Sequence, residues 1–546
     1  ALDYIDDLKN IILDDNPITR DDFDVSRDDM RKFITINCTE QEMQQAKNEF
    51  DKKYPLLNIE QKKVIDTIIE EIGMFSNYCI LGKAGTGKSF LLNTLMAYFR
   101  SKNIPYGVTA STGIASVLIK GRTLHSLFSL YSVGDTVKCG LTLSDIQGQT
   151  ITEMKYLFID EITMLSAKIF DAIDKKLRFL MTEKYGKSRD THPFGGLNLI
   201  LTGDLAQVPA VLKWCSNDLD EAKNMFTSMN CFKSFKFFTL NIIQRQRDDD
   251  VNFSYLLNEV REHENGHKLS EKSLQLLNSR FIEGGMNSDT IEKVIKFVDN
   301  DGLTVFYTNK MLDVYNDFML QRNHNGNIKT FKGIFITKPQ SSFMPNNDKN
   351  KLFSFSYSTK TDISYMRYYL KRNSNLVPID LKIAIGCRVM LLKNIDSSKG
   401  LVNGRIGVVQ EIIHQNPINA NGQILIIKFD KIRDEDEDLT IEIIRQLISE
   451  TNLPNGPKIA FYQFPIKLCY GVTAHKVQGQ TLKKVAINIQ LDAFAHGSFY
   501  VALSRVRCLD DVLLFGPDTF PKDGPNFHNN RIIQSIGNEI RNMEIV

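Results

Sequence analysis

Tyr78–Ser89, with the sequence YCILGKAGTGKS, is the stretch of this 546-residue chain that decides the fold. The apolar run Tyr78–Leu81 indicates a buried strand, and Phe90–Arg100 indicates a helix. Between them stands the pattern G-x-x-x-x-G-K-S, which in this context is typical of a phosphate-binding loop. Glycines let backbone N–H groups approach phosphate oxygens, and the start of the helix attracts anions.

The residue types of this loop predict its contacts with ATP. Lys88 is expected to reach the β- and γ-phosphates, and the Ser89 hydroxyl is expected to bind Mg²⁺. The remaining nucleotide-binding positions expected here are Gly82, Ala84, Gly85, Thr86, Gly87 and Phe90. The alternative is a Gly-rich turn that binds nothing, and the complete pattern between strand and helix argues against it.

Composition places the chain among ordinary globular proteins. Hydrophobic residues make up 42% and charged residues 24%, and the net charge is +2, which neither requires nor excludes nucleic acid. The eight cysteines contain no C-x-x-C pair, so neither a disulfide framework nor a zinc site is indicated. No apolar run approaches membrane-spanning length. The acidic N-terminus lacks a signal-like core, and it also lacks Met, which leaves a fragment or a processed chain open.

Strands and helices alternate after the loop. The segments 107–110, 156–161, 197–204 and 236–240 indicate strands, which favours a parallel sheet covered on both faces. Ligands gather at the carboxyl ends of such strands. Asp160 at one strand end can hold Mg²⁺, and Glu161 can polarise the attacking water. Further polar groups follow another strand, at Gly203, Asp204 and Gln207.

The flanking regions carry weaker signals. Thr39 and Glu42 predict a capping box in an N-terminal accessory segment. Gln61, in the first turn of a helix that Asn58 caps, is by itself most simply a surface residue. Beyond residue 240, an α/β pattern is interrupted by a polar, aromatic stretch, 323–372, which we expect to be an irregular insertion. The chain then becomes β-rich from Leu381, as a small barrel or meander, and a terminal amphipathic helix is expected around 531–543.

Several motifs of this chain, quoted below, resemble those of Pif1-family DNA helicases of superfamily 1B and occur in the same order. The resemblance covers about Leu57–Phe515. RecD-like helicases share the architecture, but two elements favour Pif1, EITMLSAKIFDAIDKKLR and CRVMLLKNIDSSKGLVNGRIGVV. The other motifs are VTASTGIAS (108–116), GRTLHS (121–126), LTGDLAQVPAV (201–211), GVTAHKVQGQTL (471–482) and FYVALSRV (499–506). Val477 stands where many relatives carry Ser, which puts one hydroxyl contact in doubt.

The resemblance implies further roles. Gln61 would read the adenine, Gln207 would sense the γ-phosphate, and Arg245 and Arg505 would be arginine fingers. Gly479 and Gln480 would line the cleft from the second motor domain, whereas Arg247 and Arg507 are expected to be structural. The residues implied to track single-stranded DNA are Thr109, Ser111, Thr112, Thr123, His125, Thr473, His475 and Lys476.

The fold class that follows is α/β, with two RecA-like P-loop domains, a small 1B wedge element and an inserted SH3-like β domain (2B). The expected boundaries are an N-terminal segment at 1–55, domain 1A at 56–242 with its 1B element at about 121–152, domain 2A at 243–394 and 466–546, and domain 2B at 395–465.

The function implied is an ATP- and Mg²⁺-dependent 5′-to-3′ DNA helicase acting on single strands and single-strand/duplex junctions in replication, repair or recombination. We expect an intracellular monomer, in the nucleus or mitochondrion of a eukaryote or in the cytoplasm of a bacterial or viral host, without a membrane partner. Two alternatives stay open: an ATPase that remodels DNA complexes without processive unwinding, and a helicase module of a larger replication or transposition protein. A small-molecule P-loop kinase is disfavoured because it needs only one α/β domain and a lid.

Overall fold

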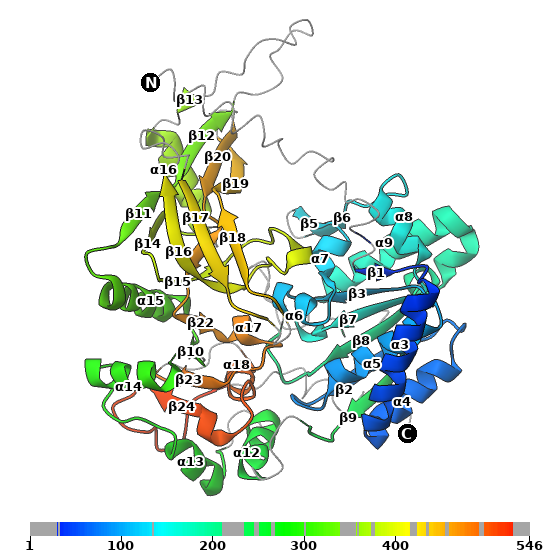
Figure 1. Cartoon of the computed structure of the whole chain (residues 1–546), viewed down its shortest axis with the longest axis horizontal. Coiled ribbons are helices and arrows are strands. Elements are labelled where there is room, and N and C mark those ends of the chain that lie inside the picture. Colours follow the sequence, from blue (N-terminus) through cyan, green and yellow to red (C-terminus); the bar gives the residue numbers. More distant parts are fainter. Residues whose placement is uncertain are drawn as a thin grey trace, which may run out of the picture. The chain divides into compact units, whose positions relative to one another are not determined.

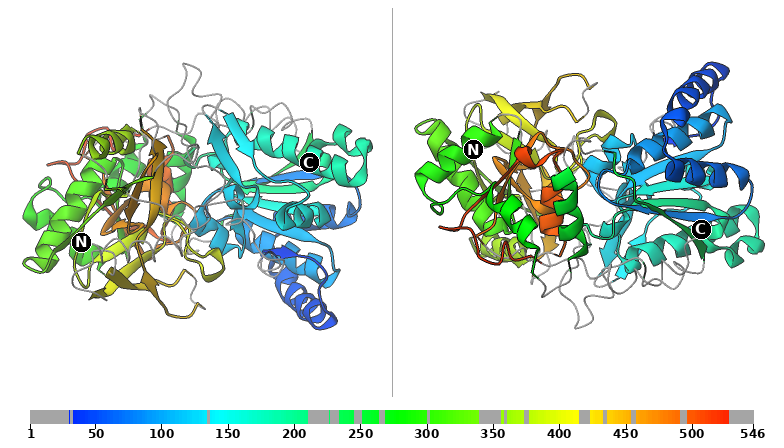
Figure 2. Two further views of the ribbon diagram at one scale, coloured as in Figure 1. Left: turned by 90° about the horizontal axis from the view of Figure 1, so that it is seen from above. Right: turned by 90° about the horizontal axis from the view of Figure 1, so that it is seen from below.

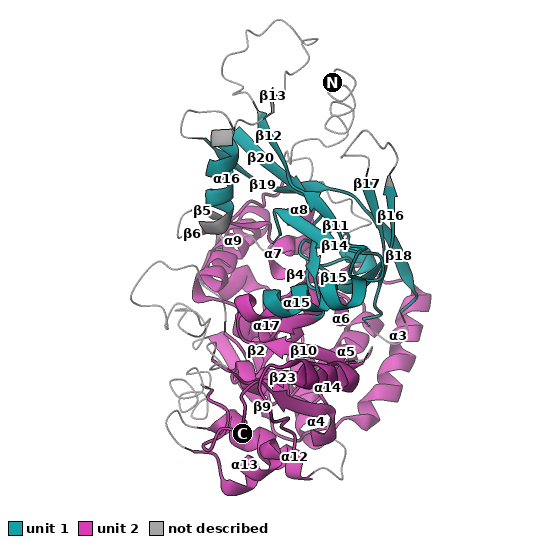
Figure 3. Cartoon of the chain, turned by 90° about the vertical axis from the view of Figure 1, so that its left-hand side faces the viewer, with its two compact units in different colours: residues 1–17, 313–470 teal, residues 18–312, 471–546 magenta. Residues whose placement is uncertain are grey.

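The computed structural model describes residues 30, 33–133, 136–209, 226, 234–244, 251–263, 268–299, 302–338, 356–357, 360–372, 377–414, 423–432, 436–453, 458–490 and 496–527. The chain divides into two compact units, with residues 1–17 and 313–470 in unit 1 and residues 18–312 and 471–546 in unit 2 (Figure 3). Arg245, Arg247 and the expected terminal helix lie outside the described residues.

Unit 2 contains a first lobe, 33–244, built on a mainly parallel sheet. The strand order is β1-β3-β7-β8-β2-β9, with a short strand β4 paired to β3. Only β1 runs antiparallel to its neighbour. The predicted strands are confirmed as β2 (Asn77–Gly82), β3 (Tyr106–Ala110), β7 (Tyr156–Asp160), β8 (Asn198–Gly203) and β9 (Phe235–Leu240). The short strands β1 (Ile34–Thr35) and β4 (Arg122–Thr123) were not predicted from the sequence.

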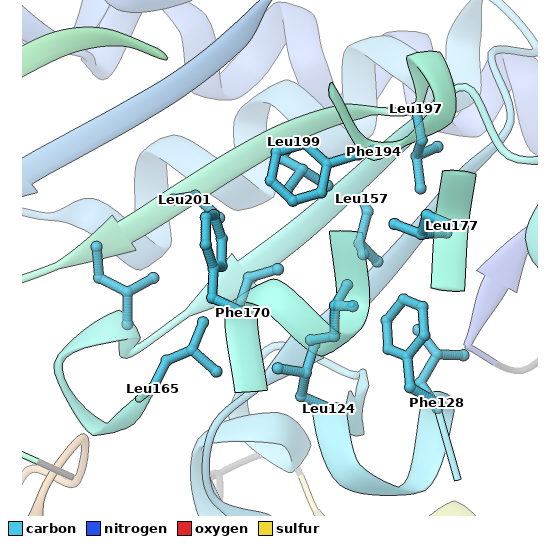
Figure 4. Packing of buried hydrophobic residues seen from close by; sticks show 14 of the residues in the cluster. Leu124, Phe128, Leu157, Leu165, Phe170, Leu177, Phe194, Leu197, Leu199 and Leu201 are labelled. Atoms are coloured by element: carbon cyan, nitrogen blue, oxygen red, sulfur yellow. The ribbon is translucent and has the colours of Figure 1, made fainter. Parts of the chain in front are cut away.

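Helices cover both faces of this sheet, because successive strand residues point to opposite sides. Tyr78 and Ile80 belong to a core shared with α4 (Ile59–Glu70) and α5 (Lys88–Ser101). Cys79 and Leu81 belong to the opposite core, which includes α9 (Ala167–Tyr185). Figures 1 and 2 show the helices on the two sides, and Figure 4 shows leucines of β7 and β8 packed against Phe170 and Leu177 of α9.

The described part of the N-terminal segment packs onto this lobe. Helix α3 (Glu40–Lys53) begins with the predicted capping box, in which the Thr39 N–H donates to Glu42 Oε2 at 2.8 Å. An ion pair of 2.7 Å joins Glu49 of α3 to Arg100 of α5. Strand β1 adds an antiparallel edge to the sheet. The segment therefore contributes to the core of the first lobe as well as to its surface.

The expected 1B element at about 121–152 is small. It begins with β4 and continues with the short helix α7 (Leu124–Leu127). A two-stranded hairpin follows, β5 (Leu130–Val133) and β6 (Thr136–Cys139), and then helix α8 (Ile146–Glu153).

The second lobe of unit 2, 251–312 and 471–527, is built on a four-stranded parallel sheet in the order β22-β10-β23-β24. This arrangement confirms the second α/β region. The strands are β10 (Gly302–Phe306), β22 (Gly471–Thr473), β23 (Lys484–Asn488) and β24 (Val512–Phe515), and the helices are α12 (Val251–Glu262), α13 (Glu271–Asn278), α14 (Ser288–Val298), α17 (Ala474–Val477) and α18 (Ser498–Leu503).

Unit 1 contains the predicted β-rich region as an antiparallel meander, to which a later strand is added. The strand order is β18-β17-β16-β15-β21. The bounds are β15 (Arg388–Leu391), β16 (Ile406–His414), β17 (Gln423–Phe429), β18 (Leu439–Ile443) and β21 (Ile466–Leu468). The compact unit begins upstream of the expected 2B boundary at residue 395.

The expectation of an irregular insertion at 323–372 is wrong for the residues that the structure describes. After α15 (Asn309–His324), this stretch contains β11 (Lys329–Lys332), β12 (Ile334–Lys338), β13 (Ser356–Tyr357) and α16 (Lys360–Arg372). Strand β11 pairs with β14 (Asp380–Ile383), and β12 pairs with β20 (Lys458–Gln463), itself paired with β19 (Gln446–Asn452). The partner of Ile336 is Ala460, too distant along the chain for a local pattern to reveal.

Within the ranges described above, we find no helix with the length and apolar character needed to cross a membrane.

Candidate nucleotide-binding site

The phosphate-binding loop connects β2 to α5 at the carboxyl edge of the first sheet. Gly85 and Gly87 have φ values of 86° and 77°, in the region that a Cβ disfavours. Gly82 is required by space instead, because a Cβ there would lie 2.6 Å from Thr86 Oγ1 and 3.0 Å from Leu240 Cβ. The loop conformation thus depends on three glycines of the predicted motif.

Lys88 and Ser89 begin helix α5 and line a cavity beside the loop. The Lys88 Nζ donates hydrogen bonds to the carbonyl oxygens of Gly82 at 2.7 Å and Lys83 at 3.1 Å. These bonds hold the ammonium group against the loop. Ser89 is exposed and is one of the residues that line this cavity.

Asp160 ends β7 on the same edge of the sheet, Glu161 follows it, and each is 7% exposed. Asp160 Oδ1 accepts hydrogen bonds from Thr202 Oγ1 at 2.6 Å and from the Glu161 N–H at 2.8 Å. Burial raises the pKa of Glu161, and the neighbouring Asp160 charge raises it further, against the opposing charges of Lys88 and Arg505. A carboxyl group with a raised pKa is better suited to accept a proton near neutral pH.

The backbone of Glu161 is held in an unusual conformation. Its φ and ψ values are 56° and 49°, in the left-handed region that costs a non-glycine residue on the order of 1–2 kcal/mol. The Ser111 hydroxyl donates to the Glu161 carbonyl oxygen at 2.8 Å. Strain of this kind is often found at functional sites.

Groups from the second lobe form the opposite wall. The Arg505 side chain is 1% exposed, and its Nε donates to Val501 O at 2.8 Å and its Nη1 to Gln480 O at 3.3 Å. Burial lowers the pKa of Arg505, while the Glu161 charge acts in the opposite direction. A Cβ on Gly479 would lie 3.3 Å from Glu161 Oε1, so the two lobes approach closely at Glu161.

Most of the predicted catalytic and nucleotide-binding residues therefore line one cavity. It is lined by Ala84, Gly85, Gly87, Lys88, Ser89, Phe90, Ala115, Leu118, Asp160, Glu161, Gln207, Gln244, Gly479 and Arg505. Gln61, Gly82, Thr86 and Gln480 were predicted for the site but do not line it. The Gln480 backbone contributes indirectly, because its carbonyl oxygen accepts from Arg505.

Gln61 is buried, so the simple expectation of a surface residue is wrong. Its Nε2 donates to Thr86 O at 2.9 Å, and its Oε1 accepts from the Asn58 N–H at 3.1 Å in a capping box. Gln61 thus stabilises the backbone of the phosphate-binding loop by a hydrogen bond to Thr86 O. Its contact with adenine stays a prediction.

Four of the hydroxyl groups predicted to track DNA, those of the first lobe, have partners within that lobe. Thr109 is fully buried and donates to Phe158 O at 2.9 Å. Thr112 caps helix α6 (Gly113–Leu118), and Thr123 caps α7. Ser111 contacts Glu161, as described above. Their roles toward DNA stay predictions, as do those of exposed His125 and of half-buried Thr473, His475 and Lys476.

His475 gives a testable pH dependence. Burial, with a contribution from the Lys476 charge, lowers its pKa to about 4, against an ordinary value near 6.5. The unfolded chain therefore binds a proton on this side chain at a higher pH than the folded protein does, so stability falls as the pH decreases through this window. Between pH 7 and pH 5 we expect His475 to account for a loss of about 2 kcal/mol.

Denaturant unfolding of the wild type and His475→Gln at both pH values measures this effect. The variant is expected to lose less stability than the wild type on acidification. An equal loss in both proteins would contradict the assignment of a neutral imidazole in the folded protein.

Three residues at the lobe contact, Gln478, Arg261 and Tyr500, were not singled out from the sequence, and Asp204 was noted only as a polar group after a strand. The Gln478 Nε2 donates to Glu161 Oε2 at 3.2 Å and to Thr163 Oγ1 at 3.1 Å. Arg261 and Tyr500 form a network with Asp204, described below. Gln478 and Tyr500 lie inside recognised motifs, but neither their burial nor their partners follow from local pattern.

The donor set of the cavity fits a magnesium ion. Asp160 supplies a carboxylate and Ser89 a hydroxyl, and hard oxygen ligands of this kind suit Mg²⁺ in phosphate-binding sites.

Comparison with known proteins shows which family the chain resembles. A family model described as PIF1-like helicase matches residues 56–269, and a second, DNA helicase Pif1, 2B domain, matches residues 372–412. Over these residues the chain is similar to the Pif1-like helicases. The second match begins upstream of the 2B boundary expected from the sequence.

Curated relatives of this Pif1-like chain include ATP-dependent DNA helicase PIF1 of Danio rerio, 27% identical over 84% of this chain and 60% of the relative. The human PIF1 helicase is 28% identical over 85% of this chain and 62% of its own length. The chain thus spans about three fifths of these relatives. A viral protein, 030L of Invertebrate iridescent virus 6, is 25% identical and is covered over 92% of its length.

Solved Pif1 structures share the fold. Pif1 helicase from Bacteroides in complex with ADP-AlF3 and ssDNA is 25% identical, with a TM-score of 0.64 over 89% of this chain and 97% of that one. Pif1 helicase from Candida albicans, 23% identical, has a TM-score of 0.61 over 88% of this chain and 99% of that one. These likenesses confirm the expected RecA-like helicase fold.

Proposed function

We propose that this chain is an ATP-dependent DNA helicase that translocates 5′ to 3′ on single-stranded DNA. The observation that carries the proposal is the single cavity in which the phosphate-binding loop, Asp160 and Glu161 of the first lobe face Gly479 and Arg505 of the second. ATP bound there contacts both lobes, so its hydrolysis changes the interaction that holds the lobes together. Nucleotide-dependent closure of this kind is what a translocating motor requires.

The proposed chemistry is transfer of the γ-phosphoryl group of ATP to water. The water oxygen bonds to the γ-phosphorus, the bond to the bridging oxygen of ADP breaks, and the water loses a proton. Glu161 orients the water and accepts this proton. Lys88 and Arg505 stabilise negative charge on the phosphoryl group from opposite sides.

Mg²⁺ would be held by Ser89 and Asp160, and it would neutralise charge on the phosphate oxygens when bound. Thr202 and the Glu161 N–H orient the Asp160 carboxylate by hydrogen bonds to Oδ1. Gln207 lines the cavity, and in this proposal it would sense the γ-phosphate.

The coupling to DNA is supported by the contact between Ser111 and Glu161. Ser111 belongs to a motif that resembles a DNA-tracking element, and its hydroxyl holds the backbone of the proposed catalytic carboxylate. A strand bound at this motif can therefore influence catalysis through one hydrogen bond. We also propose that a 2B domain is inserted in 2A and that monomers act at single-strand/duplex junctions.

The proposal is tested by unwinding of a duplex that carries either a 5′ or a 3′ single-stranded tail, in the presence of ATP and Mg²⁺. We expect unwinding only with the 5′ tail, and loss of unwinding in Lys88→Ala. Lys102→Ala, at the far end of α5, is the matched control and should unwind normally.

Two outcomes would contradict parts of the proposal. Unwinding only from the 3′ tail would overturn the polarity. DNA-stimulated ATP hydrolysis without unwinding from either tail would favour an ATPase that remodels DNA complexes.

A further inference from the structure

Tyr500 lies in the middle of α18 and joins the second lobe to the first. Its side chain is 2% exposed. The hydroxyl donates to Asp204 Oδ2 at 2.9 Å and accepts a hydrogen bond from the Ala84 N–H at 3.1 Å. Asp204 follows β8 and Ala84 is part of the phosphate-binding loop, so one hydroxyl contacts two elements of the cleft wall.

Arg261 of α12 completes this network. Its Nε and Nη2 donate to Asp204 Oδ1 at 3.2 and 3.0 Å. Burial alone would raise the pKa of Asp204, yet the charges of Arg261 and Lys88 and the Tyr500 hydrogen bond hold it below its ordinary value. Asp204, with no exposed surface, is thus a charged acceptor with fixed partners on both of its oxygens.

The backbone before α18 also lies close to the first lobe. Gly497 has a φ of 77°, and a Cβ there would overlap the carbonyl oxygen of Ala206 and lie 3.1 Å from the carbonyl carbon of Gln207. Helix α18 therefore begins in contact with the segment that carries Asp204 and Gln207, and Tyr500 fixes it there one turn later.

Arg505 follows the same helix, two residues after its last residue. The Arg505 Nε donates to Val501 O, and the Arg505 N–H donates to Ala502 O at 3.3 Å. The guanidinium group is thus tied to the helix, and its position relative to the phosphate-binding loop depends on where the helix is attached.

We propose that Tyr500, held by Asp204 and Arg261, is a positioning residue that places the Arg505 guanidinium against the phosphate-binding loop. The proposal rests on the ATP hydrolysis proposed above. When the lobes separate, the Tyr500 hydrogen bonds break and Arg505 withdraws together with α18. Hydrolysis would then proceed only while Tyr500 is docked.

The test compares DNA-stimulated ATP hydrolysis in the wild type, Tyr500→Phe, Arg505→Lys and the double variant. Because the hydroxyl bonds to a buried charged group, we expect Tyr500→Phe to lower kcat about ten-fold or more. KM for ATP should stay within about two-fold, since this variant retains the phosphate-binding loop and all its side chains. In the Arg505→Lys background the same change should alter kcat by less than about two-fold, because the two residues act as one unit.

Tyr106→Phe is the matched control. Tyr106 is also a buried tyrosine, and its hydroxyl accepts a hydrogen bond from Arg100, but it begins β3 at the edge of the sheet away from the cavity. It should keep the wild-type kcat. Asp204→Asn removes the charge that accepts the Tyr500 hydrogen bond, and so tests the same contact from the other side. In the Arg505→Lys background it should also lower kcat only slightly. Thermal unfolding identifies any variant that is not folded.

An unchanged kcat in Tyr500→Phe would overturn the proposal. An equal fall in kcat in the wild-type and Arg505→Lys backgrounds, or an effect confined to KM, would also overturn it. A wild-type protein without DNA-stimulated ATP hydrolysis would instead contradict the proposed function itself.

Discussion

Glu161→Gln is expected to lower kcat for ATP hydrolysis by about 10²–10⁴-fold, the range for removal of a general base. The amide keeps the size of the carboxylate but cannot accept the proton of the attacking water. Because the phosphate-binding loop and Lys88 are unchanged, the affinity for ATP should remain within a few-fold. Steady-state turnover with saturating single-stranded DNA, together with equilibrium binding of a fluorescent nucleotide, measures both quantities.

Glu49→Gln is the matched control for this substitution. Glu49 makes ion pairs with Lys53 and Arg100 on the surface of the first lobe, remote from the cavity. Its loss should leave kcat unchanged, since exposed ion pairs contribute little. Normal turnover in Glu161→Gln would show that Glu161 is not the general base. The strained backbone at this position would then have no catalytic explanation.

Arg505→Lys is expected to lower kcat on the order of 10³-fold, as for loss of an arginine finger. Lysine keeps the positive charge but lacks the planar fork that contacts two oxygens at once. It also cannot reproduce the bonds from Nε to Val501 O and from Nη1 to Gln480 O. Single-turnover hydrolysis of bound ATP isolates this step from product release.

Arg507→Ala provides the control two residues away. The Arg507 side chain is exposed, and the sequence predicts a structural role for it. Turnover should stay near that of the wild type. If Arg507→Ala were as slow as Arg505→Lys, the assignment of Arg505 as the catalytic arginine would be wrong.

The sequence predicted the elements whose chemistry is encoded locally. The phosphate-binding loop needs glycines at fixed positions, so its pattern identified both its place and its flanking strand and helix. Asp160 and Glu161 were recognisable because they end an apolar strand in the same α/β unit. Alternation of strands and helices correctly predicted a mainly parallel first sheet and a second α/β region.

Long-range contacts explain what the sequence did not reveal. The Gln478 amide meets Glu161 more than 300 residues away along the chain, and Tyr500 meets Asp204 at a similar separation. Gln61 was expected at the surface because a helix start is usually exposed, yet its amide binds the back of the loop. Strand β12 was missed because its partner, β20, follows it by more than 100 residues.

The position of β10 has a consequence for the order of folding during synthesis. Among the described strands, both of its neighbours, β22 and β23, come after residue 470, whereas β10 itself ends at Phe306. At bacterial and eukaryotic synthesis rates, β10 leaves the ribosome roughly 10–30 s before its first partner. The meander of unit 1, whose strands are close along the chain, can form during that interval. The second lobe is therefore expected to be the last part of the protein to fold, and its unpaired apolar strand the part most in need of a chaperone.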